Sequence, residues 1–483
     1  MKISKYIPAL LVAALLTACD DTDIPVAAPR EELPDVEDNI SGDRYDYTAT
    51  GKPERPFIHD YTASMMMKFY MAEPDRATAT SRVYMTYGQA LENIKAIDAL
   101  TRGVHKIVYL VGWQFDGHDD RYPALNVFNE ALKRESDATA RDSYLWLRSE
   151  AKKYNTTVSI HMLVGDAYTN SPLWHEYIRN EFICRDASGM FVTNGVLMGY
   201  PMYWINLHNE WRKGYLQRRL DEITELADLV DAGTVHIDAF MGHESTYHDV
   251  TREMQETVIR KVFRYMRDKG IDVTSELYCY DRIDPMIGLQ AAAWWNDIPA
   301  TQRASLPREL AAGGVSGQLS GNVWSETGFL FGDNVQAEDI FHYDRGWNQF
   351  KRDFCTQTLP YLLYGQRTVE SYDEAARRVT YSGDLVADAV AQTVKLGGVT
   401  VRDHNNLFMP AAWITDHREI IAFSESGYAS RRWTLPAGWE GIAEVAARPI
   451  TTEGPGEATV VPVVDGTVTL SLGRCEMISI QPL

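Results

Sequence analysis

The feature that most constrains the fold is a repeat, from about residue 84 onward, in which short apolar runs alternate with amphipathic stretches. Each run has the continuous apolar character of a strand that is buried on both faces. The predicted strands are Lys106–Val111, Thr157–Leu163, Thr234–Ala239 and Asp272–Leu277, with 291–295 as a possible further strand. The predicted helices lie at 88–100, 144–154, 211–226, 254–269 and 344–364. Repeated strand–helix units indicate a parallel sheet with helices outside it.

Both an open doubly wound sheet and a closed barrel satisfy this pattern. A doubly wound dinucleotide-binding fold requires G-x-G-x-x-G after the first strand, whereas this chain has Val111-Gly-Trp-Gln-Phe-Asp there. The length from about 84 to 375 suits a barrel with inserted loops. Polar and aromatic residues gather just after the strands, which is the catalytic face of barrels. We therefore predict an α/β fold of the (β/α)8 TIM-barrel type.

The pattern changes from about Gly383, where short alternating strands are separated by Gly, Pro, Asp and Asn. Such strands lie at 399–402, 419–423, 458–461 and 467–472. This pattern is typical of an antiparallel β-domain. We assign residues 44–375 to the catalytic barrel with an N-terminal extension, and residues 376–483 to a C-terminal antiparallel β-sandwich domain.

The N-terminus has the pattern of a signal peptide. Lys2 and Lys5 precede an apolar run that ends at Leu16 and is too short to remain as a membrane span. The sequence Leu16-Thr-Ala-Cys19 resembles a bacterial lipobox, although an ordinary signal peptide with a chance cysteine fits as well. We predict a lipoprotein signal peptide over 1–19, lipidation of Cys19 and a flexible tether over 20–43. The predicted location is the cell envelope, at the outer membrane or cell surface.

The charge and the cysteines exclude several kinds of partner. A net charge of −20 argues against nucleic acid and against an anionic membrane surface, so membrane contact is expected through the lipid anchor only. The other cysteines are scattered and form no C-x-x-C pair, which predicts neither a disulfide framework nor a zinc site. They are Cys184, Cys279, Cys355 and Cys475. We predict no cofactor and no metal.

Two acids stand at matching places in neighbouring strand–helix units. Asp238 lies in the apolar run Val235-His-Ile-Asp-Ala-Phe240, and Glu276 lies one unit later in Val273-Thr-Ser-Glu-Leu277. Retaining glycosidases need two carboxyls about 5–5.5 Å apart, and neighbouring strands lie about 4.8 Å apart. The alternative is that each acid forms a structural ion pair or a helix cap. The matching positions favour a catalytic pair.

Further polar residues follow the predicted strands. Gly117-His118-Asp119 comes after the first, and His161 ends the second. A neighbouring His and Asp can bind vicinal hydroxyls through charge-assisted hydrogen bonds, although metal ligation or a surface loop also fits. His243-Glu244 competes with Asp238 for the nucleophile's role, but it lies several residues past the strand. We therefore assign this pair a loop-supporting role.

Several aromatic residues also fall near strand ends, where flat amphipathic rings suit the faces of sugars. They are Trp113, Tyr203, Trp204, Trp294 and Trp295. We expect two or three of them to line a sugar site and the others to belong to the core, with Trp204 and Trp295 chosen for the site.

An ordered set of motifs resembles the catalytic domain of the endo-α-N-acetylgalactosaminidases, glycoside hydrolase family 101. In order, the set comprises Ile107-Val-Tyr-Leu-Val-Gly-Trp-Gln114, Gly117-His-Asp119, Ile160-His161, Ile237-Asp238 and Ser275-Glu276. It continues through Arg377-Arg-Val-Thr-Tyr-Ser-Gly-Asp384, Asn406-Leu-Phe-Met-Pro410 and Val464-Asp-Gly-Thr-Val-Thr-Leu470. The resemblance covers most of the chain from about 84 to its end.

The resemblance implies a retaining mechanism on α-linked N-acetylgalactosamine in mucin-type O-glycans. It would make Asp238 the nucleophile and Glu276 the acid/base, with His118, Asp119 and His161 holding the sugar. Family members usually carry large flanking β-domains and carbohydrate-binding modules, which we do not expect here. The segment that covers the sugar in the family is here Tyr200-Pro-Met-Tyr-Trp-Ile-Asn206, so that Trp204 alone matches.

Two other functions satisfy the same residues. One is a retaining glycosidase of different specificity, such as an α-galactosidase, and the other is a non-catalytic glycan-binding lipoprotein. The presence of both acids favours an enzyme, whose partner would be a glycan or glycopeptide substrate.

Overall fold

The computed structural model describes residues 33–197, 199–277, 286–295, 298–314, 325–336 and 346–483. The predicted signal peptide, Cys19, Cys279 and most of the predicted tether lie outside the described residues. Within them, no helix has the length and apolar character needed to cross a membrane. Cys184, Cys355 and Cys475 are buried free thiols.

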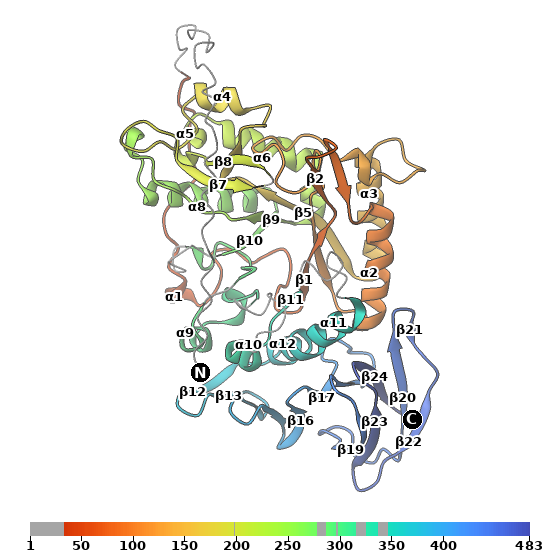
Figure 1. Ribbon diagram of the computed structural model, residues 1–483. Helices are drawn as coiled ribbons and strands as arrows, with labels where there is room; N and C mark the ends of the chain where they lie inside the picture. Colours follow the sequence, from red (N-terminus) through yellow and green to blue (C-terminus); the bar gives the residue numbers. More distant parts are fainter. Residues whose placement is uncertain (1–32, 198, 278–285, 296–297, 315–324, 337–345) are drawn as a thin grey trace, which may run out of the picture. The chain divides into compact units, whose positions relative to one another are not determined.

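A six-stranded sheet forms the centre of the N-terminal region (Figure 1), in the order β10-β9-β5-β4-β1-β11. All neighbouring strands in it are parallel. The strands are β1 (Met65–Tyr70), β4 (Lys106–Val111), β5 (Thr156–Leu163), β9 (Thr234–Asp238), β10 (Asp272–Ser275) and β11 (Val335–Gln336). Beyond β10, isolated parallel bridges join Ser275 to Ala293 and Ala293 to Gly313. The fold is therefore a mixed α/β fold with a parallel half-barrel sheet.

Two strand predictions need correction. The run 106–111 is the second strand of the sheet along the chain, because β1 precedes it. Lys68 interrupts the apolar run of β1, so the sequence pattern does not mark it as a buried strand. The segment 291–295 is not a regular strand, since Ala293 contributes only isolated bridges.

The helices that precede and follow these strands agree with the sequence pattern in most places. They are α2 (Tyr87–Thr101), α3 (Ala140–Ala151), α5 (Leu207–Arg212), α6 (Tyr215–Leu226), α7 (Leu229–Ala232) and α8 (Arg252–Asp268). Thr86 and Gln89 form a capping box at the start of α2, and the predicted apolar face of that helix is buried. The predicted helix 211–226 is instead two helices, because Gly214 has a φ of +75° and interrupts it.

The remaining helices are α1 (Tyr47–Thr50), α4 (Trp174–Arg179), α9 (Ala300–Ser305), α10 (Glu326–Phe331), α11 (Gly346–Asp353) and α12 (Leu359–Gly365). The helix predicted over 344–364 begins outside the described residues. Its described part contains a π-helical segment, Phe354–Thr358, between α11 and α12.

A buried cluster fills one face of the parallel sheet. Tyr109 and Tyr61 both direct their hydroxyls to Thr234 Oγ1, at 2.8 and 2.9 Å. Apolar residues from β1, β4, β11 and the bridging segments surround them. They are Met66, Ile107, Ala291, Ala292, Trp294, Ala312 and Val335. This packing fills the interior beneath the carboxyl ends of the strands, where Asp238 and Glu276 lie.

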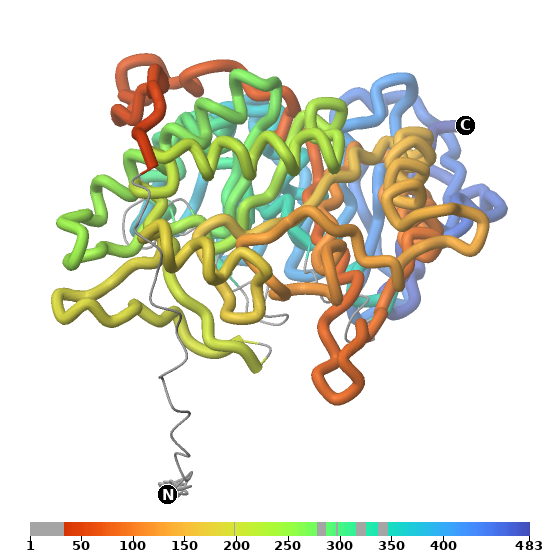
Figure 2. The backbone as a smooth tube through the Cα atoms, turned by 90° about the horizontal axis from the view of Figure 1, so that it is seen from above, coloured from red at the N-terminus to blue at the C-terminus, as the bar shows by residue number. Residues whose placement is uncertain are grey.

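Two antiparallel insertions follow the carboxyl ends of β1 and β5. One is the hairpin β2 (Ala72–Asp75) and β3 (Thr80–Val83), and the other is the sheet of β6 (Asp166–Tyr168), β7 (Thr193–Leu197) and β8 (Tyr200–Trp204). Both extend to the same side (Figure 2), where the Arg76 guanidinium stacks 3.9 Å from the centre of the Tyr200 ring. The insertions therefore flank the edge at which Asp238 and Glu276 lie.

The C-terminal region consists of an 11-stranded antiparallel sheet and a separate two-stranded ribbon, β19–β23. The strands are β12 (Val369–Asp373), β13 (Arg378–Tyr381), β14 (Leu385–Asp388), β15 (Thr393–Leu396), β16 (Val399–Asp403), β17 (Asn406–Pro410), β18 (Ile420–Ser424), β19 (Tyr428–Thr434), β20 (Glu444–Thr451), β21 (Gly454–Pro455), β22 (Thr459–Pro462), β23 (Thr467–Leu472) and β24 (Glu476–Pro482). Trp433 of the ribbon stacks on Phe408 of the sheet within one shared apolar core. The antiparallel architecture agrees with the prediction, and its first strand starts at Val369.

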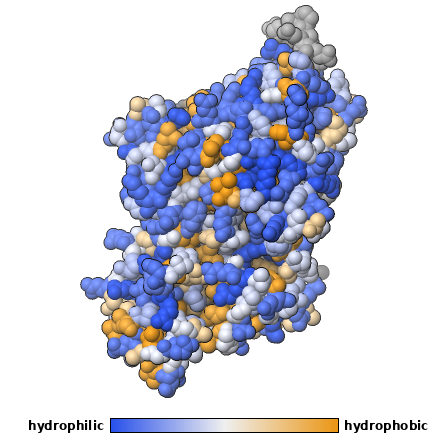
Figure 3. Space-filling model, turned by 180° about the vertical axis from the view of Figure 1, so that it is seen from behind, coloured by the Kyte–Doolittle hydropathy of each residue, from blue (hydrophilic) through white to orange (hydrophobic). Residues whose placement is uncertain are grey.

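Partly buried polar contacts join the C-terminal region to the end of α2. The Arg102 guanidinium binds the carboxylate of Glu419 at 2.7 Å, and the Trp413 indole donates to the Arg102 carbonyl at 3.0 Å. Burial alone would raise the pKa of Glu419, but Arg102 and His417 lower it to about 2. The face of the protein shown in Figure 3 is mostly hydrophilic, with its apolar residues in small separate groups.

Candidate active site

The two predicted catalytic acids lie on neighbouring parallel strands. Asp238 is the last residue of β9, and Glu276 directly follows β10. The register pairs Ile237 with Ser275, so the next residue of each strand stands at the same level. His236 Nδ1 and Thr274 Oγ1 lie 2.9 Å apart, so these two side chains share one face of the sheet. Because side chains alternate along a strand, Asp238 and Glu276, each two residues further on, belong to that face too.

Asp238 is held by three side chains from three strands. Lys68 Nζ on β1 donates to Asp238 Oδ1 at 3.0 Å, and His236 Nε2 on β9 lies 3.1 Å from the same oxygen. His161 Nε2 on β5 lies 3.3 Å from Asp238 Oδ2. The side chain of Asp238 is 15% exposed. Burial alone would raise the pKa of Asp238, but the charge of Lys68 and the contacts with His161 and His236 lower it well below its usual value.

The two histidines are neutral donors to this carboxylate. Burial, followed by the charge of Lys68, lowers the pKa of His236 to about 3, and burial also lowers the pKa of His161. A neutral imidazole has one N–H, and Nε2 of each ring faces Asp238. His236 then accepts the Thr274 hydroxyl at Nδ1. The rings stack with centroids 5.4 Å apart, which fixes their orientation.

Lys68 is the residue of this cluster that the sequence analysis missed. Its side chain is 3% exposed, and its ammonium lies 4.7 Å from the centre of the Trp294 ring. Burial of an ammonium is costly unless it is paired. The one signal in the sequence is a lysine in the middle of the otherwise apolar run Met65-Met-Met-Lys-Phe-Tyr70. Its partner lies 170 residues away, so the pattern alone does not reveal the pair.

Among the described residues, one group could converge on a metal ion. The potential ligand atoms of His161, His236 and Asp238 lie within 4.8 Å of one another. However, the Lys68 ammonium already lies 3.0 Å from the carboxylate of this group. A metal cation placed there would meet that charge at short range. The cluster therefore fits an anchored carboxylate better than a metal centre.

His118 and Asp119 lie next to the cluster, on the loop after β4. His118 Nε2 is 3.0 Å from Asp119 Oδ2, and the ring of His118 lies edge-on to that of His161 with centroids 5.2 Å apart. The loop reaches this place because Gly112 has a φ of +76° and packs against the Ala72 carbonyl, where a Cβ would lie 2.0 Å from the oxygen. The structure thus brings His118, Asp119 and His161 together beside Asp238.

Asp166 is a second acid that the sequence analysis missed. It opens β6, is buried, and accepts a hydrogen bond from Asn194 Nδ2 at 2.9 Å. Burial, reinforced by the negative charges of Asp119 and Asp238, raises the pKa of Asp166 to about 7. Its position just past β5, in the sequence Leu163-Val-Gly-Asp166, is the only signal of it in the sequence.

The aromatic residues named from the sequence divide between core and rim. Trp113 and Trp294 are fully buried, and the Trp113 indole donates to the His161 carbonyl at 2.8 Å. Trp295 is 38% exposed, and its backbone N–H donates to the Glu276 carbonyl at 2.7 Å. Trp204 is half-buried in β8, in register with Asp166. Tyr203, also half-buried in β8, packs on Trp174 instead.

The competing pair His243-Glu244 lies on the loop after β9. The Glu244 side chain is exposed, and the His243 ring stacks on Trp204 with centroids 5.6 Å apart. Gln255 Nε2 of α8 donates to the His243 carbonyl at 2.8 Å. These contacts fasten the loop to β8 and α8, which agrees with a loop-supporting role.

Part of the chain matches a known protein family. Residues 76–281 match the family model described as endo-alpha-N-acetylgalactosaminidase, glycoside hydrolase family 101. Over this segment the chain is similar to the family 101 glycoside hydrolases. The segment contains Asp238, Glu276, His118 and Asp119, whereas Lys68 precedes it. No curated protein matches the chain.

Solved structures of similar fold include an alpha-N-acetylgalactosaminidase, NagBb, from Bifidobacterium bifidum. Its GalNAc complex is 14% identical, with a TM-score of 0.52, and the match covers 70% of this chain and 57% of that chain. Its Gal-NHAc-DNJ complex is 15% identical, also with a TM-score of 0.52, and the match covers 69% of this chain and 57% of that chain. At this identity the likeness concerns the fold alone. The chain spans 57% of the length of these structures.

Proposed function

We propose that this glycoside hydrolase is a retaining enzyme that cleaves α-linked N-acetylgalactosamine of mucin-type O-glycans, with Asp238 as nucleophile and Glu276 as acid/base. The observation that carries the proposal is the cluster at the end of β9. There Lys68, His161 and His236 hold Asp238 as an anion, and Glu276 follows the neighbouring strand β10. A nucleophilic carboxylate must be ionised before the substrate arrives.

The donors around Asp238 leave one of its oxygens more available than the other. Oδ1 receives Lys68 and His236, whereas His161 is the one described partner of Oδ2. A carboxylate oxygen has two lone pairs, so Oδ2 keeps one for bond formation. Asp238 Oδ2 would attack the anomeric carbon while Glu276 gives a proton to the departing oxygen. Water, deprotonated by Glu276, would then release the sugar from Asp238.

The choice of sugar rests on the family and on the neighbouring side chains. His118 and Asp119 present a donor and an acceptor close to His161, as hydroxyl binding requires. The structures of similar fold are those of an alpha-N-acetylgalactosaminidase, one of them in complex with GalNAc. We assign His118, Asp119 and His161 to the hydroxyls of the sugar and Trp204 and Trp295 to the walls of the site.

The experiment that tests this function is product analysis on mucin-type glycopeptides. Mass spectrometry separates three results, and a released disaccharide indicates endo-action at N-acetylgalactosamine. A released N-acetylgalactosamine monosaccharide indicates exo-action on the same linkage. Turnover confined to α-galactosides would contradict the proposed sugar and support the other glycosidase specificity. Binding without any turnover would contradict an enzyme of this specificity.

We also propose that the parallel sheet closes into an eight-stranded barrel. The segments at Ala293 and Gly313 would take the places of the sixth and seventh strands, with β11 as the eighth. A Cβ at Gly314 would lie 3.3 Å from Cβ of Val335 in β11, so the two ends of the ring come close. A crystal structure in which these ends lie more than about two strand spacings apart, roughly 10 Å, would contradict closure.

We further propose that the chain is a lipoprotein of the cell envelope, anchored through Cys19. The support is the sequence pattern of basic residues, apolar run and lipobox cysteine. In a bacterial host, the wild-type chain should fractionate with membranes, whereas a Cys19→Ser variant should not. Equal membrane content of both would contradict the anchor.

A further inference from the structure

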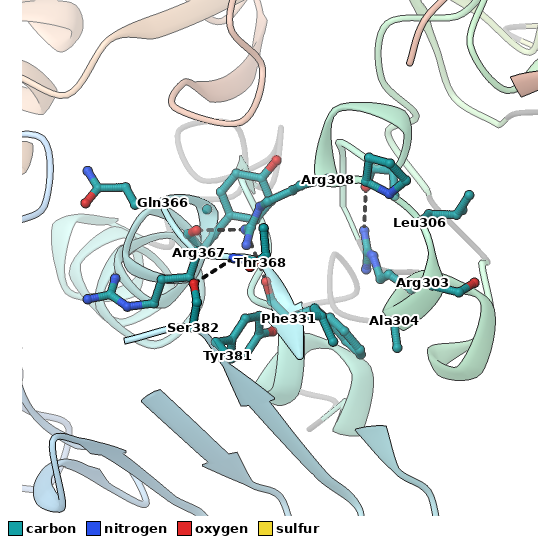
Figure 4. Close-up of a pocket in the computed structure, with 16 residues that line it drawn as sticks. Arg303, Ala304, Leu306, Arg308, Phe331, Gln366, Arg367, Thr368, Tyr381 and Ser382 are labelled. Carbon is teal, nitrogen blue, oxygen red and sulfur yellow. Dashed lines mark hydrogen bonds between the residues drawn. The ribbon is translucent and has the colours of Figure 1, made fainter. Parts of the chain in front are cut away.

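A pocket lies at the other end of the parallel strands from Asp238. It has a volume of about 560 Å³, and its walls come from residues 303–311, from the end of α12 with β12, and from β13 (Figure 4). The Tyr361 hydroxyl donates to the Tyr61 carbonyl at 3.1 Å, and a Cβ at Gly365 would lie 2.9 Å from the Thr62 carbonyl oxygen. Both contacts reach the chain just before β1 begins, whereas Asp238 ends β9. The pocket is therefore separate from the candidate active site.

The pocket is positively charged in a strongly acidic protein. Arg303, Arg308 and Arg367 line it, and its described lining residues include neither Asp nor Glu. The whole chain carries a net charge of −20. Like charges brought together in a partly buried wall repel one another, and an anion between them removes that repulsion. The charge distribution indicates an anionic ligand.

Arg308 and Arg367 have no carboxylate partner among the described residues. Arg308 Nη2 donates to the carbonyls of Tyr361 and Phe331, at 2.7 and 3.2 Å, and its guanidinium stacks 3.7 Å from the centre of the Tyr361 ring. Arg367 Nη1 donates to the Leu363 carbonyl at 2.6 Å, and burial lowers the pKa of Arg367. A guanidinium has five N–H groups, so each keeps donors for a ligand. The Nε of Arg308 is buried and has no hydrogen-bond partner in the described structure.

The other walls of the pocket carry hydroxyl groups, from Thr368 and Ser382. Phe331, Tyr361 and Tyr381 also line it, but their rings are buried. Tyr361 is held flat beneath Arg308, and Tyr381 is anchored by a hydrogen bond to the Leu330 carbonyl at 2.6 Å. Hydroxyl groups bind the polar edges of sugars. Exposed Thr368 leaves the pocket accessible from solvent.

We propose that this pocket binds an acidic saccharide, with its carboxylate or sulfate on Arg308 and Arg367 and its hydroxyl groups on Thr368 and Ser382. The site is non-catalytic and distinct from the cluster around Asp238. It would hold an acidic part of a glycan on the enzyme independently of cleavage. Carboxylated and sulfated sugars present the same chemistry to a pair of guanidiniums, so both are tested.

The test is isothermal titration calorimetry on the full chain with matched pairs of sugars. Glucuronic acid is compared with glucose, and N-acetylglucosamine 6-sulfate with N-acetylglucosamine, while inorganic sulfate probes the anion alone. At least one acidic sugar should bind about tenfold or more tightly than its neutral counterpart. The same acidic sugar should also bind more tightly than inorganic sulfate. A preference for one acidic sugar identifies the source of the anion.

Variants connect the binding to the two arginines. Arg367→Gln and Arg308→Gln should each weaken binding of the acidic sugar by about tenfold or more. Arg474→Gln removes an exposed arginine of the C-terminal region and should leave binding unchanged. If Arg308→Gln fails to fold, because its carbonyl contacts are lost, Arg367→Gln decides the matter. Hydrolysis of an aryl glycoside by Arg367→Gln should equal that of the parent chain, which separates this site from the proposed reaction.

Three results would overturn the proposal. The first is equal affinity for acidic and neutral sugars, or no binding of either up to about 10 mM. The second is unchanged affinity in Arg367→Gln. The third is inorganic sulfate binding as tightly as the acidic sugars, which would mean that the pocket takes a bare anion.

Discussion

Two carboxyl groups beside the same edge of the sheet have pKa values that are shifted in opposite directions. Asp238 ends β9, and Asp166 opens β6 directly after β5. Burial raises the pKa in both places, but Lys68, His161 and His236 reverse the effect at Asp238. At Asp166 the Asn194 amide offsets only part of it, and the pKa rises to about 7. The difference is a buried cation within 3.0 Å of Asp238.

The surroundings of Asp238 therefore keep its carboxylate ionised, while those of Asp166 favour its protonated form. A carboxylate that is paired with an ammonium remains charged under acidic conditions, as a nucleophile must. A carboxyl group with only a neutral amide as partner changes charge near neutral pH. The roles of the two acids therefore follow from their partners and not from their burial.

The largest expected effect on turnover comes from removing the negative charge of Asp238. Asp238→Asn should lower kcat by about four orders of magnitude or more on every substrate, because no glycosyl-enzyme can form. Glu276→Gln should be selective, since an aryl glycoside with a good leaving group needs little protonation. Added azide should then rescue turnover of Glu276→Gln with retained configuration. Steady-state kinetics and NMR of the products measure both effects.

A fall of less than about tenfold for both variants, which is ~1.4 kcal/mol of barrier, would place the catalytic pair elsewhere. Glu244 is then the next acid to replace. Folding of both variants is checked by circular dichroism, so that loss of activity is not loss of structure.

The second effect concerns Lys68, the cation that lowers the pKa of Asp238 and has no counterpart at Asp166 among the described contacts. Lys68→Met should lower kcat/KM by about a hundredfold at neutral pH, because a buried charge loses its partner. It should also raise the pKa of Asp238, so that the acid limb of the pH profile moves to higher pH and activity is lost first at low pH. Lys95→Met, which removes an exposed lysine of α2, serves as the matched control. An acid limb that stays in place would contradict the role of Lys68.

The third effect concerns the side chains next to the cluster. His118→Ala or Asp119→Asn should each weaken transition-state binding by about 1.5–3 kcal/mol, because a sugar hydroxyl loses a hydrogen-bond partner that is charged or paired with a charge. This corresponds to a decrease of about 10- to 150-fold in kcat/KM. Equal kinetics of both variants and the parent would mean that these residues do not contact the sugar.

The smallest effect on turnover is expected at Asp166, where stability is the sharper measurement. Its folded pKa of about 7 lies above the unfolded value of 3.8, so the folded state binds more protons between these values. Stability should therefore fall as pH rises from 5 to 8, by roughly 2–3 kcal/mol from this group. Asp166→Asn should remove that part of the fall, as measured by urea unfolding at both pH values. A variant that loses stability as steeply as the parent would contradict the raised pKa.

The sequence allowed the positions of Asp238 and Glu276 on neighbouring strands to be predicted because their signal is local. Asp238 and Glu276 each interrupt or follow an apolar run, and their spacing of one strand–helix unit places them on neighbouring strands. The helix at 88–100 was predictable for the same reason, since periodicity and the Thr86 cap lie within one segment. Lys68 and Asp166 carried no comparable signal. Their meaning depends on partners that other strands bring to them.

The sequence by itself determined the alternation of strands and helices, the change to antiparallel strands and the acids at the strand ends. These follow from the order of apolar and polar residues along a short stretch of chain. Only the tertiary structure decided that β1 precedes the run at 106–111 and that Lys68 forms an ion pair with Asp238. It also decided that Arg308 and Arg367 line one pocket. Such features depend on contacts between distant segments, because electrostatic energy follows distance in space and not separation along the chain.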